Sequence, residues 1–381
     1  MSESIELTHF IRETIRHEGP VTFRWFMEQA LYHPEWGYYA SGKAVVGKKG
    51  DFYTSVSVGG LFGELLTRQF HEIWQRMGCP DEFSLFEQGA DRAQLAADVL
   101  GAAQRFYPDF FAALTYQIVE PSTQLRAEQA ANLANWSGKV EWRERIEEFS
   151  GVAYSNELLD AMPVHVVSRC DDKWREDYVD ESGDSFQFVP GPISSAELAL
   201  ALAKLPEGLP PDAYRTEINL AGPAWIREVA RSMRRGCALV IDYGFLRDQY
   251  YSIERREGTL RCYRQHQRHD NPFSEIGRTD ITAHVDFSAC IDAGIENGLS
   301  LAGFTDQHHF LTGISEPEFA AIEAESQRGL SAETQRRLRT LQSLLHPGTM
   351  GMQFKYLALT KGIDFDEPLL GFSAARQITA H

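Results

Sequence analysis

The chain has 381 residues, of which 43% are hydrophobic, 12% aromatic and 24% charged, a balance typical of globular proteins and not of disordered, collagenous or disulfide-scaffold chains. Its 54 acidic and 37 basic residues give a net charge of −17, which repels nucleic-acid phosphates and anionic lipid and favours cationic partners such as arginine-bearing protein segments. Length alone allows two or three domains, or one large α/β domain with insertions.

The cysteines and the start of the chain bear on compartment and metal binding. The five cysteines are scattered along the chain, and no two of them form a CxxC pair. Neither a disulfide framework nor a thiolate zinc site is therefore indicated. The pairs His266 with His269 and His308 with His309 do not complete a familiar ligand set, so no metal is expected. The acidic start has neither the apolar core of a secretory leader nor an arginine-rich transit sequence, and no stretch approaches the ~18 apolar residues of a membrane span. We therefore expect a cytoplasmic protein without a membrane segment.

The first 80 residues predict a helical cap that contains a long loop. Apolar residues at three- and four-residue spacing indicate helices over 5–17, 22–31 and 61–77. The glycine-rich, aromatic loop between the second and third helices is too long for a simple connection, so we expect it to cover a cofactor. Its Gly47-Lys-Lys-Gly50 segment lacks the spacing of a phosphate-binding loop, which disfavours ATP.

From residue 81 the pattern changes to short apolar runs that alternate with amphipathic helices, as in a parallel sheet with crossover connections. The predicted strands cover 84–87, 115–120, 152–156 and 237–244, and the predicted helices cover 93–106, 124–136 and 224–235. This order predicts an open α/β sheet of Rossmann type.

Two departures from simple alternation predict additions to this sheet. Residues 164–190 are typical of short strands joined by turns, which indicates an inserted β-meander. Residues 303–313 and 352–361 predict two more strands, separated by a helical stretch over 316–345, that add an antiparallel edge.

The predicted domain organisation follows from these elements. We expect a cap and cofactor-covering loop over 1–80, and a Rossmann-like domain over 81–361 with insertions at about 164–190 and 245–285. A loose C-terminal tail is expected over 362–381, which shows no clear period.

Ligands of an open α/β sheet bind beyond the carboxyl ends of its strands, so the residues directly after each apolar run are informative. Most of them are acidic. They are Glu87-Gln-Gly89-Ala90-Asp91, Glu120-Pro121-Ser122, Asn156-Glu157 and Asp242-Tyr243-Gly244.

These strand ends favour S-adenosylmethionine over a dinucleotide. A small-residue turn at Gly89 lets a cofactor approach the backbone, and Glu120 can accept hydrogen bonds from both ribose hydroxyls. The loop has a single glycine, and Asp91 would repel a pyrophosphate, which argues against NAD and FAD. An acid beside the loop is compatible with a cofactor that carries a sulfonium and no phosphate. A plain strand-to-helix turn at Gly89 is the alternative.

Several long motifs, in order along nearly the whole chain, resemble the MidA family of S-adenosylmethionine-dependent methyltransferases. They are Trp36-Gly-Tyr-Tyr39, Gly50-Asp-Phe-Tyr-Thr-Ser55, Leu61-Phe-Gly-Glu64, Asn156-Glu-Leu-Leu-Asp-Ala-Met-Pro-Val-His165, Asp242-Tyr-Gly244, Gly258-Thr-Leu-Arg-Cys-Tyr263 and Asp280-Ile-Thr-Ala-His-Val-Asp-Phe287. That family includes bacterial proteins and a mitochondrial complex I assembly factor that methylates an arginine of a subunit.

The resemblance implies a class I methyltransferase fold with a seven-stranded Rossmann-like sheet. It also implies cofactor contacts from Glu87, Gly89, Glu120 and the loop that holds Thr54 and Ser55; the neighbouring Ala90, Pro121 and Asn156 complete the expected cofactor site. Two segments depart from the family pattern. The common Gly-x-Gly-x-Gly loop is Gly89-Ala-Asp-Arg-Ala93 here, and the usual Thr-Ser-Pro-Glu is Thr54-Ser-Val-Ser57.

Glu157 and Asp160 are the predicted catalytic pair, with Tyr243 assisting. Two carboxylates can hold a planar guanidinium bidentately and localise its lone pair on the nitrogen to be methylated. Their i, i+3 spacing after a strand can direct both side chains to one cavity. In the alternative, Asp160 caps the next helix and Glu157 binds the cofactor.

Four further residues are predicted to contact the substrate: His165, Arg261, Asp280 and His284. His165 would continue the site wall, although a hydrogen-bonded strand histidine is the simpler role. Arg261 lies in a basic stretch over 255–268, which a solvated loop would also explain. Asp280 and His284 would form the rim of the site, in a segment whose Asp286 is well placed as a helix N-cap.

The main hypothesis is therefore an enzyme that transfers a methyl group from S-adenosylmethionine to a protein side chain, most plausibly arginine. The partner would be a respiratory-complex subunit or another arginine-bearing protein, and the exposed meander could serve a homodimer. A second hypothesis is a binding or assembly protein that keeps the fold without turnover. A third, an NAD-dependent oxidoreductase, is disfavoured by Asp91 and the single glycine.

Overall fold

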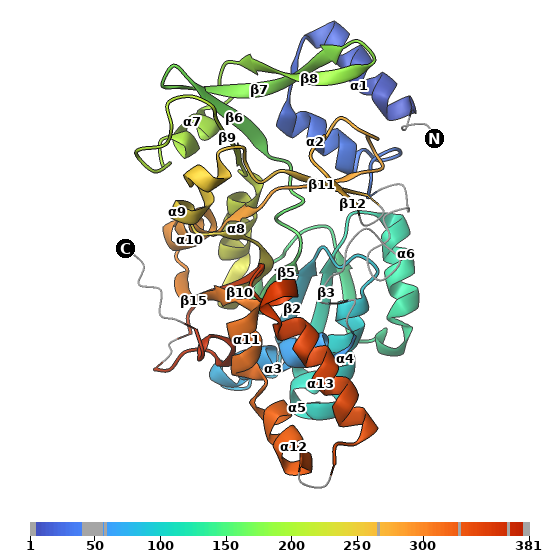
Figure 1. The fold of residues 1–381 in the computed structure, drawn as a ribbon. Coiled ribbons are helices and arrows are strands. Elements are labelled where there is room, and N and C mark those ends of the chain that lie inside the picture. The colour runs from blue at the N-terminus through green and yellow to red at the C-terminus, as the bar shows by residue number, and fades with distance from the viewer. Residues whose placement is uncertain are drawn as a thin grey trace. The chain divides into compact units, whose positions relative to one another are not determined.

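The computed structural model describes residues 5–39, 56, 59–264, 267–326, 329–363 and 366–375 (Figure 1). The chain forms two compact units. The first unit comprises 1–53, 159–224 and 244–290, and the second comprises 54–158, 225–243 and 291–381. The chain passes from the second unit into the first directly after Leu158 and directly after Tyr243.

The second unit is built on a sheet of mainly parallel strands, of which Figure 1 labels β10, β5, β2 and β3 side by side. The order is β15 (Ser300–Asp306), β16 (Phe354–Lys361), β10 (Met233–Phe245), β5 (Phe149–Asn156), β2 (Phe83–Gln88), β3 (Leu114–Val119) and β4 (Val140–Arg143). Strand β16 is antiparallel to both neighbours, and the strands from β10 to β4 are parallel. The predicted class I α/β sheet with an antiparallel edge pair is confirmed.

Helices cover both faces of this sheet because successive strand residues point to opposite sides. On one face, Leu85, Tyr154 and Leu239 belong to a buried cluster with α3 (Leu61–Arg76), α4 (Gln94–Phe106), α11 (Gln307–Ile314) and α13 (Ala332–Leu345). On the other face lies α10 (Phe287–Glu296), and α8 (Ala221–Ser232) precedes β10 in the sequence. A Cβ added at Gly294 of α10 would come within 2.7 Å of Leu359. Two shorter helices, α5 (Pro108–Ala113) and α6 (Thr123–Asn132), flank β3 in the sequence.

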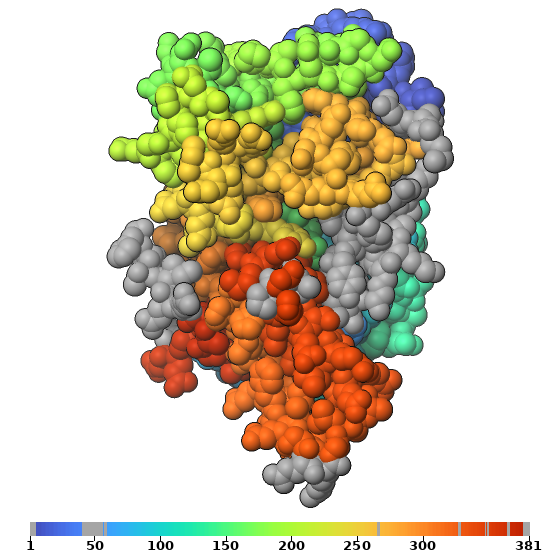
Figure 2. Space-filling model, in the orientation of Figure 1, coloured from blue at the N-terminus to red at the C-terminus, as the bar shows by residue number. Residues whose placement is uncertain are grey.

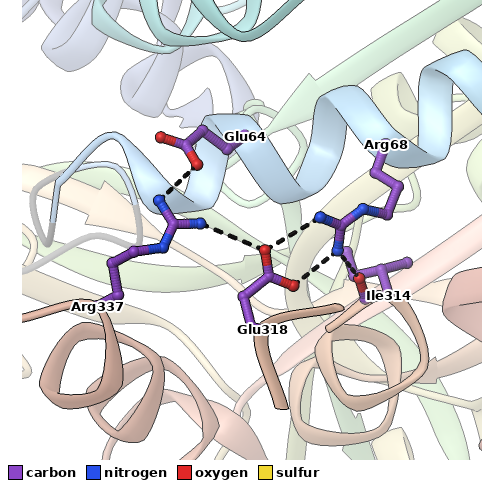
Figure 3. A network of polar contacts seen from close by, with 5 residues as sticks. All are labelled: Glu64, Arg68, Ile314, Glu318 and Arg337. Carbon is purple, nitrogen blue, oxygen red and sulfur yellow. Dashed lines mark hydrogen bonds and ion pairs between the residues drawn. The ribbon is translucent and has the colours of Figure 1, made fainter. Parts of the chain in front are cut away.

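A network of ion pairs ties the C-terminal helices to α3, and Figure 3 shows it from close by. Glu318 of α12 (Glu316–Ser326) accepts two hydrogen bonds from Arg68, at 2.7 and 3.0 Å, and one from Arg337 at 3.3 Å. Arg337 also donates to Glu64 at 2.7 Å, and Arg68 to the carbonyl of Ile314. Because Glu318 is only 9% exposed, both arginines are needed to offset the cost of burying its charge.

The first unit contains two antiparallel sheets. In the larger, the order is β1 (Val21–Thr22), β7 (Lys173–Ser182), β6 (His165–Cys170) and β9 (Tyr214–Ile218), with β8 (Ser185–Gly191) also paired to β7. The consecutive antiparallel pairs β6–β7 and β7–β8 confirm the predicted meander. In the smaller, β11 (Arg261–Arg264) lies between β12 (Gln267–His269) and β13 (Asp280–Thr282). The short β14 (Val285–Asp286) pairs with the last two residues of β10.

Two N-terminal helices, α1 (Ile5–Glu18) and α2 (Phe23–Tyr32), pack on the meander as their amphipathic patterns predict. Thr22 caps α2 by accepting a hydrogen bond from the Trp25 amide at 3.2 Å. The Phe23 and Phe188 ring centroids are 5.3 Å apart, and complete burial of a phenylalanine contributes about 1.5–3 kcal/mol. The unit also holds α7 (Ala196–Leu202) and α9 (Arg247–Tyr250).

The predicted strand over 303–313 and helix over 224–235 are wrong in extent. Asp306 ends β15 and caps α11 by accepting from the His309 amide at 3.0 Å, so 307–314 are helical. Helix α8 ends at Ser232 because β10 already pairs with β5 from Met233. Gly236 therefore lies inside a strand and does not close the helix; a Cβ there would meet the Gly151 carbonyl oxygen at 1.8 Å.

Two predictions near the C-terminus are also corrected. The helical stretch over 316–345 is two helices, because Ser331 caps α13 by accepting from the Thr334 amide at 3.1 Å. The expectation of a loose tail fails within 366–375, where Phe372 is 4% exposed and its ring lies 5.3 Å from that of Phe310. Within the described parts of the chain, none of the helices has the length and apolar character that crossing a membrane requires.

Candidate functional site

The second unit has a topological switch point between β2 and β5. Strand β2 pairs with β3 on one side and with β5 on the other, and crevices at such points bind ligands beyond the carboxyl ends of the strands. The predicted cofactor residues follow these strands directly. The sheet therefore brings the segments after Glu87, Glu120 and Asn156 to one edge.

The loop after β2 keeps the backbone of a glycine-rich loop with only one of its three glycines. Gly89, Asp91 and Ala93 have φ of +83°, +42° and +61°, and these are the three positions at which the resembled family carries glycine. A left-handed backbone costs an L-residue roughly 1–2 kcal/mol, so the fold maintains this shape at Asp91 and Ala93 against local preference. Ala90 is buried in the core of the unit.

Glu120 lies at the end of β3 and is oriented by its neighbours. Its Oε1 accepts from the Ser122 amide at 2.9 Å, and its Oε2 accepts from Gln129 Nε2 at 3.4 Å. Burial raises the pKa of Glu120, and the nearby Asp91 carboxyl adds to the rise. Pro121, beside it, is exposed.

Gln129 of α6 is a positioning residue that the sequence analysis did not identify. Besides Glu120, its side chain donates to the Asp91 carbonyl at 2.8 Å, and it accepts from Trp142 Nε1 at 2.8 Å. It is fully buried, so it links the loop after β2 to the end of β3. The sequence around Gln129 gives no sign of this positioning role, since a glutamine on a polar helix is normally exposed.

Glu87 points into the core of the unit. Its carboxylate is 2% exposed and accepts from the Tyr116 hydroxyl at 2.6 Å, and the Tyr116 and Tyr154 hydroxyls are hydrogen-bonded to each other. Burial raises the pKa of Glu87 to about 7, although the two tyrosines oppose the rise. This placement makes Glu87 a buried support of the sheet edge.

The end of β5 combines a strained backbone with an acceptor that has no partner. Glu157 has φ of +55°, and its amide donates to the Ile241 carbonyl at 2.9 Å. Asn156 Nδ2 donates to Glu157 Oε1 at 3.1 Å, whereas Asn156 Oδ1 is buried without a hydrogen-bond partner among the described residues. Strain of this kind occurs at ligand sites. Asn156 Oδ1 and the Glu120 carboxylate thus fit a cofactor that offers hydroxyl or ammonium donors.

Residues Asp242 and Tyr243 end the part of β10 that belongs to the second unit. The Asp242 side chain is fully buried and accepts from the Tyr243 amide at 2.8 Å. The Tyr243 ring stacks beside Phe354 of β16, with 4.1 Å between ring centroids. Tyr243 is therefore part of the sheet edge that holds Glu157, in the same unit.

Asp160 and Asp280 belong to the first unit, where both are buried among tyrosines. Tyr39 donates to Asp280 Oδ1 at 3.0 Å, and its ring stacks on that of Tyr32 with 5.3 Å between centroids. Burial and then the fields of Asp280 and Asp160 raise the pKa of Tyr39 well above its ordinary value. Tyr263 pairs with Asp280 in the β11–β13 ladder, and its pKa is raised by burial with contributions from the same aspartates.

We call these five residues the tyrosine–aspartate cluster: Tyr32, Tyr39, Tyr263, Asp160 and Asp280. Asp160 and Asp280 are 7% and 4% exposed. The two aspartates are among the site residues predicted from the sequence, whereas Tyr32 and Tyr39 are not. The signal for them was the Trp36-Gly-Tyr-Tyr39 motif itself.

The other predicted substrate residues have mainly internal partners. His165 shares a 2.7 Å hydrogen bond with the buried Glu176. Burial opposes ionisation of Glu176, but hydrogen bonds from His165 and Ser194 outweigh it and lower the pKa of that carboxyl. The amide of His284 donates to Thr259 Oγ1 at 3.0 Å. Arg261 donates to the Leu260 carbonyl at 2.6 Å and is half-buried.

Two predictions remain untested by this geometry. Thr54 and Ser55 lie outside the described residues. The expectation that no metal is bound also stays a prediction: within the described ranges, Cys170, Asp171 and Asp212 could approach a common ion, but all three are exposed. The Asp212 carboxylate accepts from the Asp171 amide at 2.7 Å.

Comparison with known proteins gives matches over most of the chain. Residues 65–305 match a protein family described as "Putative S-adenosyl-L-methionine-dependent methyltransferase". The mitochondrial protein arginine methyltransferase NDUFAF7 homolog of Drosophila melanogaster is 30% identical over 95% of this chain and 87% of its own length. Human NDUFAF7, also named a mitochondrial protein arginine methyltransferase, is 26% identical over 91% and 81%.

A solved structure is similar over almost the full length. It is a "likely methyl transferase" from Burkholderia thailandensis bound to S-adenosyl-homocysteine, with a TM-score of 0.83 and 32% identity. The match covers 97% of this chain and 95% of that one.

Proposed function

Because this chain belongs to the family of S-adenosyl-L-methionine-dependent methyltransferases, we propose that it methylates the guanidinium group of an arginine in a protein. The observation that carries the choice of acceptor is the tyrosine–aspartate cluster of the first unit. The names of the relatives, which are protein arginine methyltransferases, support the same choice.

The cofactor is assigned to the sheet edge of the second unit. When bound, S-adenosylmethionine supplies a methyl group on a positively charged sulfur. Glu120 is oriented by Ser122 and Gln129 to accept hydrogen bonds from ribose hydroxyls. Asn156 Oδ1 is available to an amino or hydroxyl donor. Gly89 has no Cβ and takes the left-handed backbone without strain, which allows a cofactor to approach the chain closely at that position.

The tyrosine–aspartate cluster suits a guanidinium for two reasons. Carboxylates bind the planar guanidinium through paired, charge-assisted hydrogen bonds. The faces of tyrosine rings attract cations, an interaction worth about 0.5–2 kcal/mol. Asp160 and Asp280 would thus hold the charge of the arginine, while Tyr39, fixed by its bond to Asp280, would position that carboxylate.

Glu157 is the proposed catalytic carboxylate of the second unit. Its backbone is held in the left-handed region and its carboxylate is held by Asn156, so its orientation is set before substrate binds. Tyr243 ends the neighbouring strand and is proposed to assist.

Label transfer tests this function. The full-length protein is incubated with S-adenosylmethionine carrying a tritiated methyl group and with proteins of an extract from cells that lack this gene. The proteins are then hydrolysed and their amino acids separated. We expect label in methylarginine, and at least about a tenfold lower yield with Asp280→Asn, whose affinity for S-adenosylhomocysteine should be unchanged. Asp184→Asn, in an exposed turn of the same unit, is the matched control.

Two outcomes of this assay separate the alternatives. Label in another amino acid overturns the arginine assignment and leaves the methyltransferase activity intact. Cofactor binding without label in any protein favours the binding or assembly protein. The NAD-dependent oxidoreductase is opposed by the antiparallel β16 between β10 and β15, since the dinucleotide fold continues with parallel strands.

The setting of the reaction is part of the proposal. We propose action in the cytoplasm on an arginine-bearing protein, with a respiratory-complex subunit as one such substrate, and a homodimer formed through the meander. Cell fractionation tests the location. Light scattering of the purified protein tests the dimer, and a monomer at micromolar concentration would exclude it.

A further inference from the structure

The first unit contains a pocket of about 410 Å³ that the proposed methylation does not use. It lies among β9, the segment over 253–261 and β12, with Phe188 of β8 in its wall. Figure 2 shows the segment from α9 to β12, in yellow to orange, at the visible surface. Five arginines line the pocket: Arg215, Arg255, Arg256, Arg261 and Arg268.

Five arginines against four acids leave the lining with a formal net charge of +1, whereas the whole chain has a net charge of −17. Four acids share the lining, and two of them have partners of their own. Glu217 is 2% exposed and accepts from the amide and hydroxyl of Thr259, at 2.7 and 3.0 Å. Asp270 lies 3.6 Å from Arg268. The other two are Glu254 and the exposed Glu257.

Arg215 is fixed in the wall with part of its donor capacity unused. Its guanidinium lies 3.8 Å from the centre of the Phe188 ring, and its Nε is 3.1 Å from Asp177 Oδ2. Its Nη2 is buried and has no hydrogen-bond partner among the described residues. Leaving a buried charged donor unsatisfied costs about 1–3 kcal/mol or more, so an acceptor brought by a ligand would relieve this cost.

Arg255 and Arg261 are held in place by neutral groups. Arg255 stacks at 3.7 Å from the centre of the Phe245 ring and donates to the Gln249 carbonyl at 2.6 Å. Arg261 donates to the Leu260 carbonyl. Because these contacts are to uncharged partners, they orient the guanidinium groups without cancelling their charge. Guanidinium groups arranged in this way recognise carboxylate and phosphate oxygens.

We propose that this pocket binds a compact oxyanion group, a phosphate or a carboxylate, with Arg215 and Arg261 as its principal ligands. The pocket volume exceeds what one such group needs and falls within the range of small-molecule sites, so the anion would be carried on a larger molecule. The anion would belong either to a free metabolite or to an acidic side chain of a bound protein. The inference does not depend on the methylation reaction.

Calorimetric titration of the full chain tests the proposal. Inorganic phosphate, phosphoserine and a hexaglutamate peptide are titrated at low salt with S-adenosylhomocysteine present in excess, so that the cofactor site does not contribute. We expect saturable binding of at least one of them, weakened at least about tenfold in Arg261→Gln and in Arg215→Gln. Arg24→Gln, on the surface of α2 in the same unit, should bind as the unaltered protein does.

The ligand profile distinguishes the two sources. Tighter binding of phosphate or phosphoserine supports a phosphorylated metabolite, and tighter binding of hexaglutamate supports an acidic protein segment. Absence of saturable binding by all three, or unchanged affinity in Arg261→Gln, overturns the proposal. Because Arg215 also pairs with Asp177, circular dichroism of Arg215→Gln checks its folding, and Arg261→Gln keeps the test decisive if that variant unfolds.

Discussion

Replacing Glu87 by glutamine should make the protein more stable at alkaline pH. Burial raises the pKa of this carboxyl from its ordinary 4.5 to about 7, so the folded protein binds a proton that the unfolded chain releases. Such a group stabilises fully below the pKa of the unfolded chain, and its contribution is lost as pH rises through the folded pKa. The loss therefore falls between pH 4.5 and about 7.

The size of this loss follows from the shift. At 1.36 kcal/mol per pKa unit, a shift of this size corresponds to about 3 kcal/mol. Glutamine is always neutral, can accept the hydrogen bond from Tyr116, and can donate to the Tyr154 hydroxyl. Glu87→Gln should therefore exceed the free energy of unfolding of the unaltered protein by less than about 1 kcal/mol at pH 5 and by about 3 kcal/mol at pH 8.

Urea unfolding at pH 5, 6, 7 and 8 measures this difference. Glu82→Gln, an exposed position just before the same strand, controls for general effects of charge on stability. The same variant tests whether Glu87 contacts the cofactor, as the family resemblance implies. Because the carboxylate points into the core, the affinity for S-adenosylhomocysteine should change less than about threefold. A stability difference independent of pH would refute the linkage argument, and a tenfold loss of affinity would refute the inward placement.

Three other variants have expected outcomes. Glu318→Ala leaves the guanidinium of Arg68 without its carboxylate and should lower the free energy of unfolding by about 3 kcal/mol. Glu64→Ala breaks a more exposed ion pair and should lower it by less than about 1 kcal/mol. Urea unfolding measures both changes. Gly89→Ala places a Cβ at 3.2 Å from Leu158 on a left-handed backbone and should weaken S-adenosylhomocysteine binding in calorimetry, while Gly138→Ala, with open space around it, should not. Tyr39→Phe removes the bond to Asp280 and should reduce label transfer several-fold with cofactor affinity intact.

The sequence predicted the sheet well because its signals are local. Apolar runs such as the one at 237–244 are long enough to identify central strands, and acids at their ends identify the ligand edge. Strand β4 was missed, since its four residues at the sheet edge have little hydrophobic pattern. The helix over 307–314 was missed because its apolar residues continue those of β15 and only the cap at Asp306 separates the two.

The site was harder to predict because side-chain direction depends on tertiary packing. The sequence places Glu87 at the end of its strand but does not show that two tyrosines from neighbouring strands hold it inside. It likewise does not reveal that Gln129 connects two loops. The left-handed backbone at Ala93 is also hidden, since alanine gives no sign of it.

The central claim is that the sheet edge of the second unit binds S-adenosylmethionine through Glu120. Calorimetric titration of S-adenosylhomocysteine into the unaltered protein, Glu120→Gln and Glu128→Gln tests it directly, with Glu128 a half-exposed residue of the adjacent α6. We expect micromolar binding to the unaltered protein and to Glu128→Gln, and binding at least about tenfold weaker to Glu120→Gln, since one charge-assisted hydrogen bond contributes about 1.5–3 kcal/mol. Absence of binding to the folded protein, or equal affinity in Glu120→Gln, would contradict the claim.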